Sequence, residues 1–304
     1  MKTLWRLSLA AVIVAYGAVM LGSWTRINGA GMTCPDWPRC DGRLVPPLGD
    51  GTVWEWTHRL LVFVLTPLVI AVVVAAWRNR KRSPFIAPTM WAIALLFAFQ
   101  VFLGAATVHL SNSPISVVWH WGTAMAFIAG LCAMAIFARA GLRGSPPAAR
   151  ESNAAETILT GVLAGTTLVA FVTMCVGAYV SSSGAGLACL SVPGCAGNVV
   201  VYSPGQYVQM LHRFIAAACL LSAVASFALA WAWRAAARVR LMATVGLLLV
   251  FVQVLLGLLN VALRLPIDLR EAHAANAALV FLAFVIATTF AILGAVRTYE
   301  PVAA

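Results

Sequence analysis

The sequence predicts an all-α integral membrane protein with eight transmembrane helices, arranged as two pseudo-symmetric four-helix bundles. Of its 304 residues, 62% are hydrophobic and only 10% are charged, and the mean hydropathy is +0.93. Eight apolar runs of about 20 residues are each long enough to cross a bilayer. Motifs of cysteine and histidine also occur twice along the chain. The predicted spans cover 7–24, 57–77, 85–109, 117–138, 157–180, 207–233, 241–263 and 272–296.

Lys and Arg residues gather on one side of the predicted spans. The run RNRKRS (78–83) joins the second and third spans, and RAAARVR (234–240) joins the sixth and seventh. The other cations on this side are Lys2, Arg6, Arg139, Arg143, Arg150 and Arg297. Because cytoplasmic loops hold the excess of Lys and Arg, we expect both termini inside the cell. The net charge of +11 thus reflects topology in a plasma membrane, with lipid as a partner and nucleic acid excluded.

Two short loops on the opposite side each contain a pair of cysteines. They read TCPDWPRC (33–40) and ACLSVPGC (188–195), both with five residues between the cysteines. An oxidising exterior lets disulfides persist, so we predict Cys34–Cys40 and Cys189–Cys195, worth roughly 2 or 3 kcal/mol each. A redox role for the first pair stays open, and a zinc site shared by all four is disfavoured by an oxidising exterior. The three remaining cysteines lie inside spans and are interpreted as packing residues: Cys132, Cys175 and Cys219.

The chain repeats itself at an offset of 153 to 155 residues. Cys34 returns as Cys189 after 155 residues, and five of five residues tested at this offset are identical in type. We therefore expect two parallel repeats, 1–145 and 157–304, joined by a cytoplasmic linker at 146–156. The first span has an internal counterpart, so we do not expect it to be a cleaved signal peptide.

Four of the five histidines form repeat-related pairs, each near the outer end of an even-numbered span. His58 and His120 in the first half correspond to His212 and His273 in the second. Ionisable side chains at this depth are costly and usually functional. Two imidazoles on different helices of one bundle suit the two axial positions of a haem iron. A zinc ion would need a third ligand, which is missing here, and a copper ion would favour a thiolate or methionine ligand as well. The fifth, His109, is interpreted as a boundary residue.

Charged residues beside the histidines differ between the halves. Arg59 and Arg213 directly follow the first histidine of each pair, where they could meet haem propionates or reach the membrane interface. Glu55 lies one helical turn before His58, whereas its counterpart is Gln209. A carboxylate could stabilise positive charge developing on a ring methyl group or accept its proton. We therefore expect catalysis in the first half and electron relay in the second; the alternative is a Glu facing a helix dipole.

Several motifs together resemble haem A synthase of the bacterial type. They are EWTHR (55–59), VWHWG (118–122), QMLHR (209–213) and EAHAAN (271–276), together with the two cysteine loops. The resemblance covers nearly the whole chain and implies an enzyme that oxidises a ring methyl group of haem O to the formyl group of haem A. It also implies a resident haem B on His212 and His273, and substrate haem on His58 and His120. Haem O synthase and an unidentified electron acceptor are the partners it implies.

Two other classes of protein fit parts of the pattern. A di-haem cytochrome that carries electrons from quinol would use the same histidines, but a carrier across about 30 Å of hydrocarbon favours haems stacked through the membrane. All four histidines lie on one side. A thiol–disulfide oxidoreductase would use the cysteine loops but leave the histidines unexplained.

Overall fold

The chain folds into eight long helices, each long and apolar enough to cross a membrane, which confirms the predicted fold class. The computed structural model describes residues 1–49, 51–141, 154–195, 197 and 201–297, and these contain no β-strand. Two short 3₁₀ helices, η1 (Arg80–Arg82) and η2 (Ala185–Leu187), lie in the connections. The long helices are α1 (Lys2–Ile27), α2 (Thr52–Asn79), α3 (Ile86–His109), α4 (Pro114–Ala140), α5 (Ala154–Ser182), α6 (Pro204–Ala232), α7 (Ala237–Ala262) and α8 (Ile267–Arg297).

Most helices extend beyond the apolar runs that predict them. Helix α2 begins five residues before the predicted span, and this extension makes Glu55 part of its first turn. Pro114 and Pro204 occupy the first positions of α4 and α6, where a residue without an N–H group costs no hydrogen bond. Polar residues at the helix ends therefore belong to the helices, although hydropathy alone excludes them.

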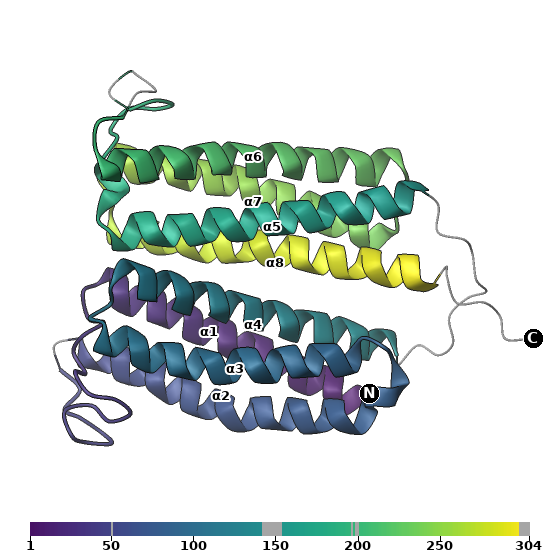
Figure 1. The fold of residues 1–304 in the computed structure, drawn as a ribbon, viewed down its shortest axis with the longest axis horizontal. Helices are drawn as coiled ribbons and strands as arrows, with labels where there is room; N and C mark the ends of the chain where they lie inside the picture. The colour runs from purple at the N-terminus through teal and green to yellow at the C-terminus, as the bar shows by residue number, and fades with distance from the viewer. Residues whose placement is uncertain (50, 142–153, 196, 198–200, 298–304) are drawn as a thin grey trace, which may run out of the picture.

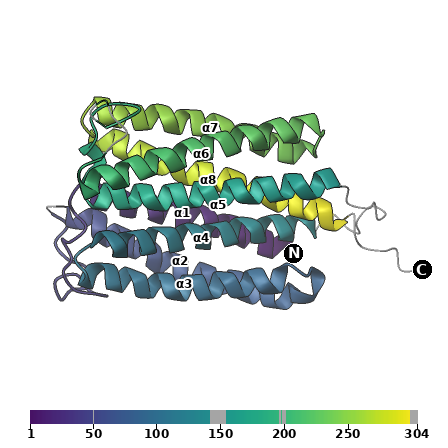
Figure 2. The same ribbon diagram turned by 45° about the horizontal axis from the view of Figure 1, so that its top comes forward.

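Each half is a closed ring of four helices. In the first half α1 packs on α2, α2 on α3, α3 on α4, and α4 returns to α1; α5 to α8 form the same ring. Figure 1 shows the two bundles beside each other, with α1 to α4 below and α5 to α8 above. Their helices run roughly parallel over their whole length, as the turned view also shows (Figure 2). This arrangement supports the interpretation of the chain as a duplicated four-helix unit.

Helices α4 and α8 form the centre of the protein. In their most apolar windows 67% and 56% of residues are buried, against 17–28% in the other helices, whose outer faces are left for lipid. The two helices pack on each other across the boundary between the halves. Across the same boundary α4 also contacts α5, and α8 also contacts α1. Each half therefore places one of its histidine-bearing helices against the other half.

Polar side chains also join the halves near the end that carries the cysteine loops. Ser23 of α1 donates a hydrogen bond to the Glu271 carboxylate of α8, with Oγ and Oε2 2.8 Å apart. Arg26 of α1 donates to the hydroxyl of Ser181 of α5, at 3.0 Å from Nη2 to Oγ. Inside a low-dielectric environment such bonds are costly to break, so they fix the position of one bundle against the other.

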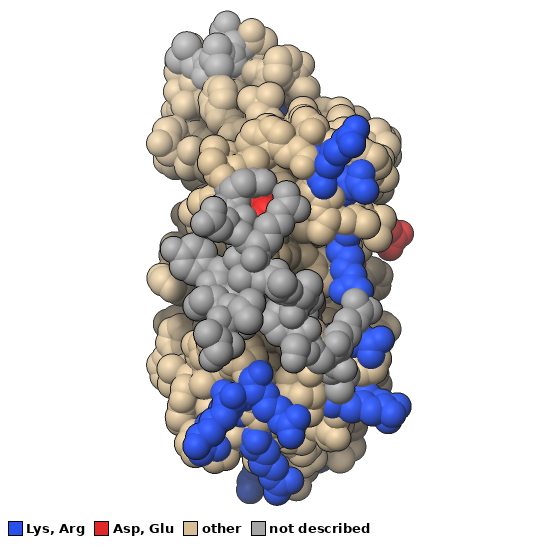
Figure 3. Space-filling view, turned by 90° about the vertical axis from the view of Figure 1, so that its right-hand side faces the viewer, with Lys and Arg blue, Asp and Glu red and all other residues tan. Residues whose placement is uncertain are grey.

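The two ends of the bundle differ in charge. Lys and Arg side chains spread over the end at which α1 begins and the α2–α3 and α6–α7 connections lie (Figure 3). The opposite end carries the two cysteine loops. Of the predicted linker 146–156, residues 146–153 lie outside the described residues, and 154–156 form the first turn of α5. Arg143 and Arg150 also lie outside them.

Candidate functional site

The structure places all four paired histidines near the loop-bearing end of the bundle. His58, His120 and His273 lie six residues after the first residue of α2, α4 and α8, and His212 lies eight residues after the first residue of α6. At about 1.5 Å per residue these positions are about 9–12 Å along each helix. They are therefore below the surface loops but far from the cationic end.

The two histidines of each half lie near one another inside their bundle. His58 and His120 are close enough to interact electrostatically, and so are His212 and His273. Helices α2 and α4 are diagonal in the first ring, as α6 and α8 are in the second. Each of these four histidine residues is only partly buried by surface area, although protein surrounds it.

In the first half a glycine of the preceding helix lies against each histidine ring. A Cβ atom added to Gly22 of α1 would lie 2.8 Å from Cε1 of His58, closer than real Cβ atoms approach. A Cβ atom on Gly104 of α3 would lie 3.3 Å from Cε1 of His120. Any larger residue would push the ring away from its place.

The second half has the same contacts. A Cβ atom on Gly177 would lie 2.9 Å from Cε1 of His212, and one on Gly257 would lie 3.3 Å from Cε1 of His273. These four glycines are repeat-related, and from the sequence alone they served only to mark the register of the repeat. A sequence pattern could have revealed them: each helix that precedes a histidine-bearing helix contains a glycine, and this glycine recurs in the other half together with the histidine.

Hydrogen bonding prepares Nε2 of His58 to act as a ligand. Its Nδ1 lies 2.8 Å from the carbonyl oxygen of Ala18, which only accepts, so Nδ1 carries the hydrogen and Nε2 keeps its lone pair. His212 faces the backbone of Thr173, the equivalent position, at a looser geometry. Among the described residues, Nδ1 of His212 and of His273 are buried without a hydrogen-bond partner.

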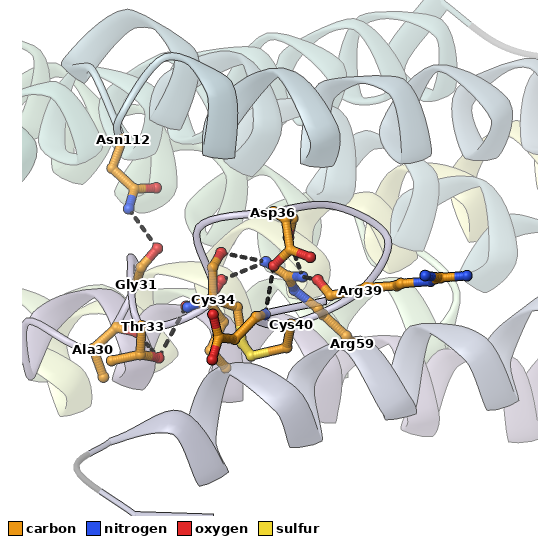
Figure 4. Close-up of polar contacts among 11 residues, drawn as sticks. Ala30, Gly31, Thr33, Cys34, Asp36, Arg39, Cys40, Arg59 and Asn112 are labelled. Atoms are coloured by element: carbon orange, nitrogen blue, oxygen red, sulfur yellow. Dashed lines mark hydrogen bonds and ion pairs between the residues drawn. A yellow bond between two sulfur atoms is a disulfide. The ribbon is translucent and has the colours of Figure 1, made fainter. Parts of the chain in front are cut away.

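Arg59 holds the first cysteine loop onto α2. Its Nη1 donates to the carbonyl oxygens of Asp36, at 2.7 Å, and Arg39. Its Nη2 donates to the carbonyl oxygen of Cys34 at 2.9 Å (Figure 4). The guanidinium thus satisfies several loop carbonyls at once, which a planar group with five donors does well.

Arg213 makes the same contacts in the second half. Its Nη1 donates to the carbonyl oxygens of Ser191 at 2.7 Å and Gly194 at 2.9 Å, and its Nη2 to that of Cys189 at 2.9 Å. Sequence reasoning considered propionates and the membrane interface as partners of these arginines and missed the loop. Contacts to propionates stay a prediction, and in the structure the loop carbonyls engage both guanidinium groups.

Glu55 anchors the same loop through its carboxylate. Oε2 accepts hydrogen bonds from the backbone N–H of Cys34 at 2.9 Å and from the hydroxyl of Thr33 at 3.1 Å. Oε1 forms an ion pair with Nη2 of Arg59 at 2.7 Å. The side chain is only 5% exposed. A buried carboxylate paired in this way keeps a fixed orientation.

Gln209 repeats the anchoring role of Glu55 without its charge. Its Oε1 accepts from the backbone N–H of Cys189 at 2.6 Å, and its Nε2 donates to the carbonyl of Gly186 at 2.8 Å. Both residues therefore fasten a cysteine loop to a helix. The difference that distinguishes the halves is the negative charge of Glu55.

The cysteine loops are cross-linked as the sequence predicts. Disulfides join Cys34 to Cys40 and Cys189 to Cys195, with Cα atoms 4.5 and 4.6 Å apart. In the first loop the backbone N–H groups of Gly42 and Asp41 donate to the Asp36 carboxylate and, with Arg59, hold the pKa of that carboxyl below its usual range. The remaining cysteines are free and lie within helices: Cys132, Cys175 and Cys219.

The donor set of the site favours a haem over a bare metal ion. Within the part of the chain that the structure describes, no group of three or more His, Cys, Asp or Glu side chains could hold a metal ion. Two histidines from different helices of one bundle are instead a ligand set that a haem iron takes. His109 is exposed at the last residue of α3 and belongs to neither pair.

Eight helices that can span a membrane, among the described residues, with one histidine pair inside each four-helix bundle, define a multi-pass membrane protein. The chain belongs to the COX15-CtaA family of cytochrome oxidase assembly proteins, whose sequence model matches residues 5–285. The match includes all four histidines and both cysteine loops.

Several similar proteins are named heme A synthase. That of Bacillus licheniformis is 27% identical over 283 residues, which cover 90% of this chain and 91% of the relative. That of Shewanella oneidensis is 27% identical over 94% of this chain and 95% of its own length. That of Bacillus pumilus is 29% identical over 71% of this chain and 70% of its own length.

The glycine contacts predict that a larger residue disturbs haem ligation by the histidine while the protein still inserts into the membrane. Gly177→Ala should displace the His212 ring, because the added Cβ would lie 2.9 Å from Cε1. We expect the low-spin spectrum of a haem bound in the second half to weaken or become high-spin. Gly165→Ala in the same helix is the control, since nothing lies within 4 Å of its Cβ position. Identical spectra for the two variants would contradict the packing role of Gly177.

The arginine contacts predict that charge alone cannot hold a cysteine loop. Arg213→Lys keeps the positive charge but loses the planar fork that reaches the carbonyls of Ser191, Gly194 and Cys189. Cleavage of the 183–203 loop by protease in intact membranes should become faster, whereas Lys2→Arg should leave it unchanged. Unchanged cleavage with loss of haem would favour a propionate contact instead.

Proposed function

We propose that the chain is a haem A synthase that oxidises a ring methyl group of haem O to a formyl group, supplying haem A for terminal oxidase assembly. The observation that carries the proposal is the histidine pair inside each bundle, in a family of cytochrome oxidase assembly proteins. The relatives named heme A synthase cover most of this chain. Eight helices that can span a membrane suit an apolar, membrane-bound substrate.

The second half holds a resident haem B on His212 and His273. Their Nδ1 atoms are buried without partners among the described residues, and glycines give both rings room, so the residues fit the group. When bound, haem B supplies one-electron redox chemistry between substrate and an external acceptor. His212 and His273 would hold it, and the loop fixed by Arg213 lies at that end of the bundle.

The first half binds the substrate haem between His58 and His120. The carbonyl of Ala18 holds the His58 ring so that Nδ1 carries the hydrogen and Nε2 keeps its lone pair. Glu55, one turn away, carries a fixed negative charge. As the ring methyl group loses electrons and a proton, this carboxylate stabilises the developing positive charge and can accept the proton.

The haems and the cysteine loops lie towards the outer face of the cell membrane, and both termini lie inside. The cationic end of the bundle supports this orientation because cytoplasmic segments hold the excess of Lys and Arg (Figure 3). The disulfides support it as well, since they persist in an oxidising compartment. Haem O synthase and an electron acceptor complete the set of proposed partners.

Haem analysis of histidine variants tests the proposed function. His212→Ala or His273→Ala should remove haem B, because each deletes an axial ligand of the resident group. His58→Ala or His120→Ala should keep haem B but yield no haem A when haem O is supplied. His109→Ala, outside both pairs, is the control. An unchanged low-spin spectrum in both second-half variants would overturn the assignment, and haem A made by both first-half variants would overturn the substrate site.

The comparison of Glu55 and Gln209 predicts that the charge of Glu55 accelerates the chemistry. In Glu55→Gln the new amide oxygen can still accept from the backbone N–H of Cys34, as that of Gln209 does from Cys189, while the charge and the ion pair with Arg59 are lost. Losing one well-placed electrostatic stabiliser costs on the order of a hundred- to a thousand-fold in rate. We expect normal haem B content and little haem A. Gln209→Glu is the matched control and should keep turnover; near-normal haem A in both variants would leave Glu55 a loop anchor only.

A further inference from the structure

A glutamine precedes the second histidine of each pair, but the two glutamines are held differently. Gln100 of α3 and Gln253 of α7 are 153 residues apart, as are His120 and His273. Each glutamine therefore occupies the same position beside its histidine. Their hydrogen bonds nevertheless go to different partners, and this difference bears on how tightly each pocket can hold a haem.

In the first half the amide of Gln100 faces the histidine ring itself. Its Nε2 lies 3.0 Å from Nδ1 of His120 and 3.4 Å from Nε2. An amide nitrogen only donates, so the nearer ring nitrogen must present its lone pair, and the hydrogen of the neutral imidazole is then on Nε2. A ring in that state cannot bind iron through Nε2. The amide oxygen of Gln100 is meanwhile buried without a partner among the described residues.

Rotation of this amide by half a turn reverses the situation. The oxygen of Gln100 then accepts a hydrogen bond from Nδ1–H of His120, and Nε2 of the ring is free to ligate. The same rotation gives the buried oxygen the partner that it lacks. Ligation by His120 is therefore coupled to the orientation of one side-chain amide.

In the second half a neighbouring asparagine prevents this rotation. Asn276 is buried, and its Nδ2 donates to Oε1 of Gln253 at 2.7 Å and to the carbonyl of Leu249 at 2.9 Å. The Nε2 of Gln253 donates to the backbone carbonyl of His273 at 3.0 Å and not to its ring. No described group donates to Nδ1 of His273, so nothing forces the ring hydrogen onto Nε2, and the Nε2 lone pair stays available.

We propose that Gln100 is a positioning residue that makes haem binding in the first half reversible, and that Asn276 removes this control in the second half. The inference rests on the proposed function, in which the first half exchanges substrate and product while the second retains its haem. The residue equivalent to Asn276 in the first half is Thr123, 153 residues earlier. Threonine has no amide, so Gln100 stays free to turn towards or away from the ring.

The physical consequence is that the two halves should retain haem for different lengths of time. A pocket whose ligand is available only in one amide orientation binds with an affinity reduced by the population of that orientation. Haem in the first half should therefore leave faster than haem in the second. A single hydrogen bond of this kind changes such an equilibrium by on the order of two- to ten-fold.

Exchanging the two residues tests the proposal. Thr123→Asn should hold Gln100 away from the His120 ring as Asn276 holds Gln253, and Asn276→Thr should free Gln253. Purified protein loaded with haem O is mixed with excess apomyoglobin, and transfer of each haem is followed by absorbance and by extraction and chromatography. We expect haem O to leave Thr123→Asn two- to ten-fold more slowly. Haem B should leave Asn276→Thr faster by a similar factor.

The untouched half of each variant reports on folding, because its own haem should leave at the wild-type rate. Thr123→Val keeps the shape of threonine without an amide and should exchange haem O as the wild type does. Wild-type rates in both exchanged variants, or slowing by Thr123→Val as large as by Thr123→Asn, would overturn the role of the amide. Failure of every variant and of the wild type to bind haem O would instead overturn the proposed function, and the haem B arm would still decide the role of Asn276.

Discussion

The structure depends on four imidazole rings that each lie against a glycine of the preceding helix. Because Gly22, Gly104, Gly177 and Gly257 carry no side chain, the rings lie close against the preceding helices inside the bundles. In lipid a helix already satisfies its own backbone, so close packing and a few hydrogen bonds determine how helices associate. The glycines therefore set helix spacing and ligand position together, and the same contact appears in both halves.

The cysteine loops are attached to this framework by side chains of the helices below them. Arg59 and Arg213 bind loop carbonyls, while Glu55 and Gln209 accept from the backbone of the first cysteine. A disulfide alone restrains only the short segment between its cysteines. The helix-borne contacts fix that segment relative to the histidines one turn away, so loop and pocket form one rigid unit.

The two halves share a framework but differ at a few polar positions, and these differences separate their proposed roles. Glu55 brings a negative charge to one pocket where Gln209 is neutral. Asn276 restrains Gln253, whereas Thr123 leaves Gln100 beside a histidine ring. In the proposed function, differences at such positions suit the first half to chemistry and exchange and the second half to retention.

The sequence by itself determined the eight helices, the two cysteine pairs and the four histidines, because hydropathy, charge and internal repetition are properties of local sequence. It also singled out Glu55, since its counterpart is not acidic. Only the tertiary structure decided that the arginines and Glu55 hold the loops, that glycines receive the rings, and that Asn276 restrains Gln253. These contacts join residues 16 or more positions apart on different elements. Their partners depend on how helices pack and where a loop folds back, which no local pattern encodes.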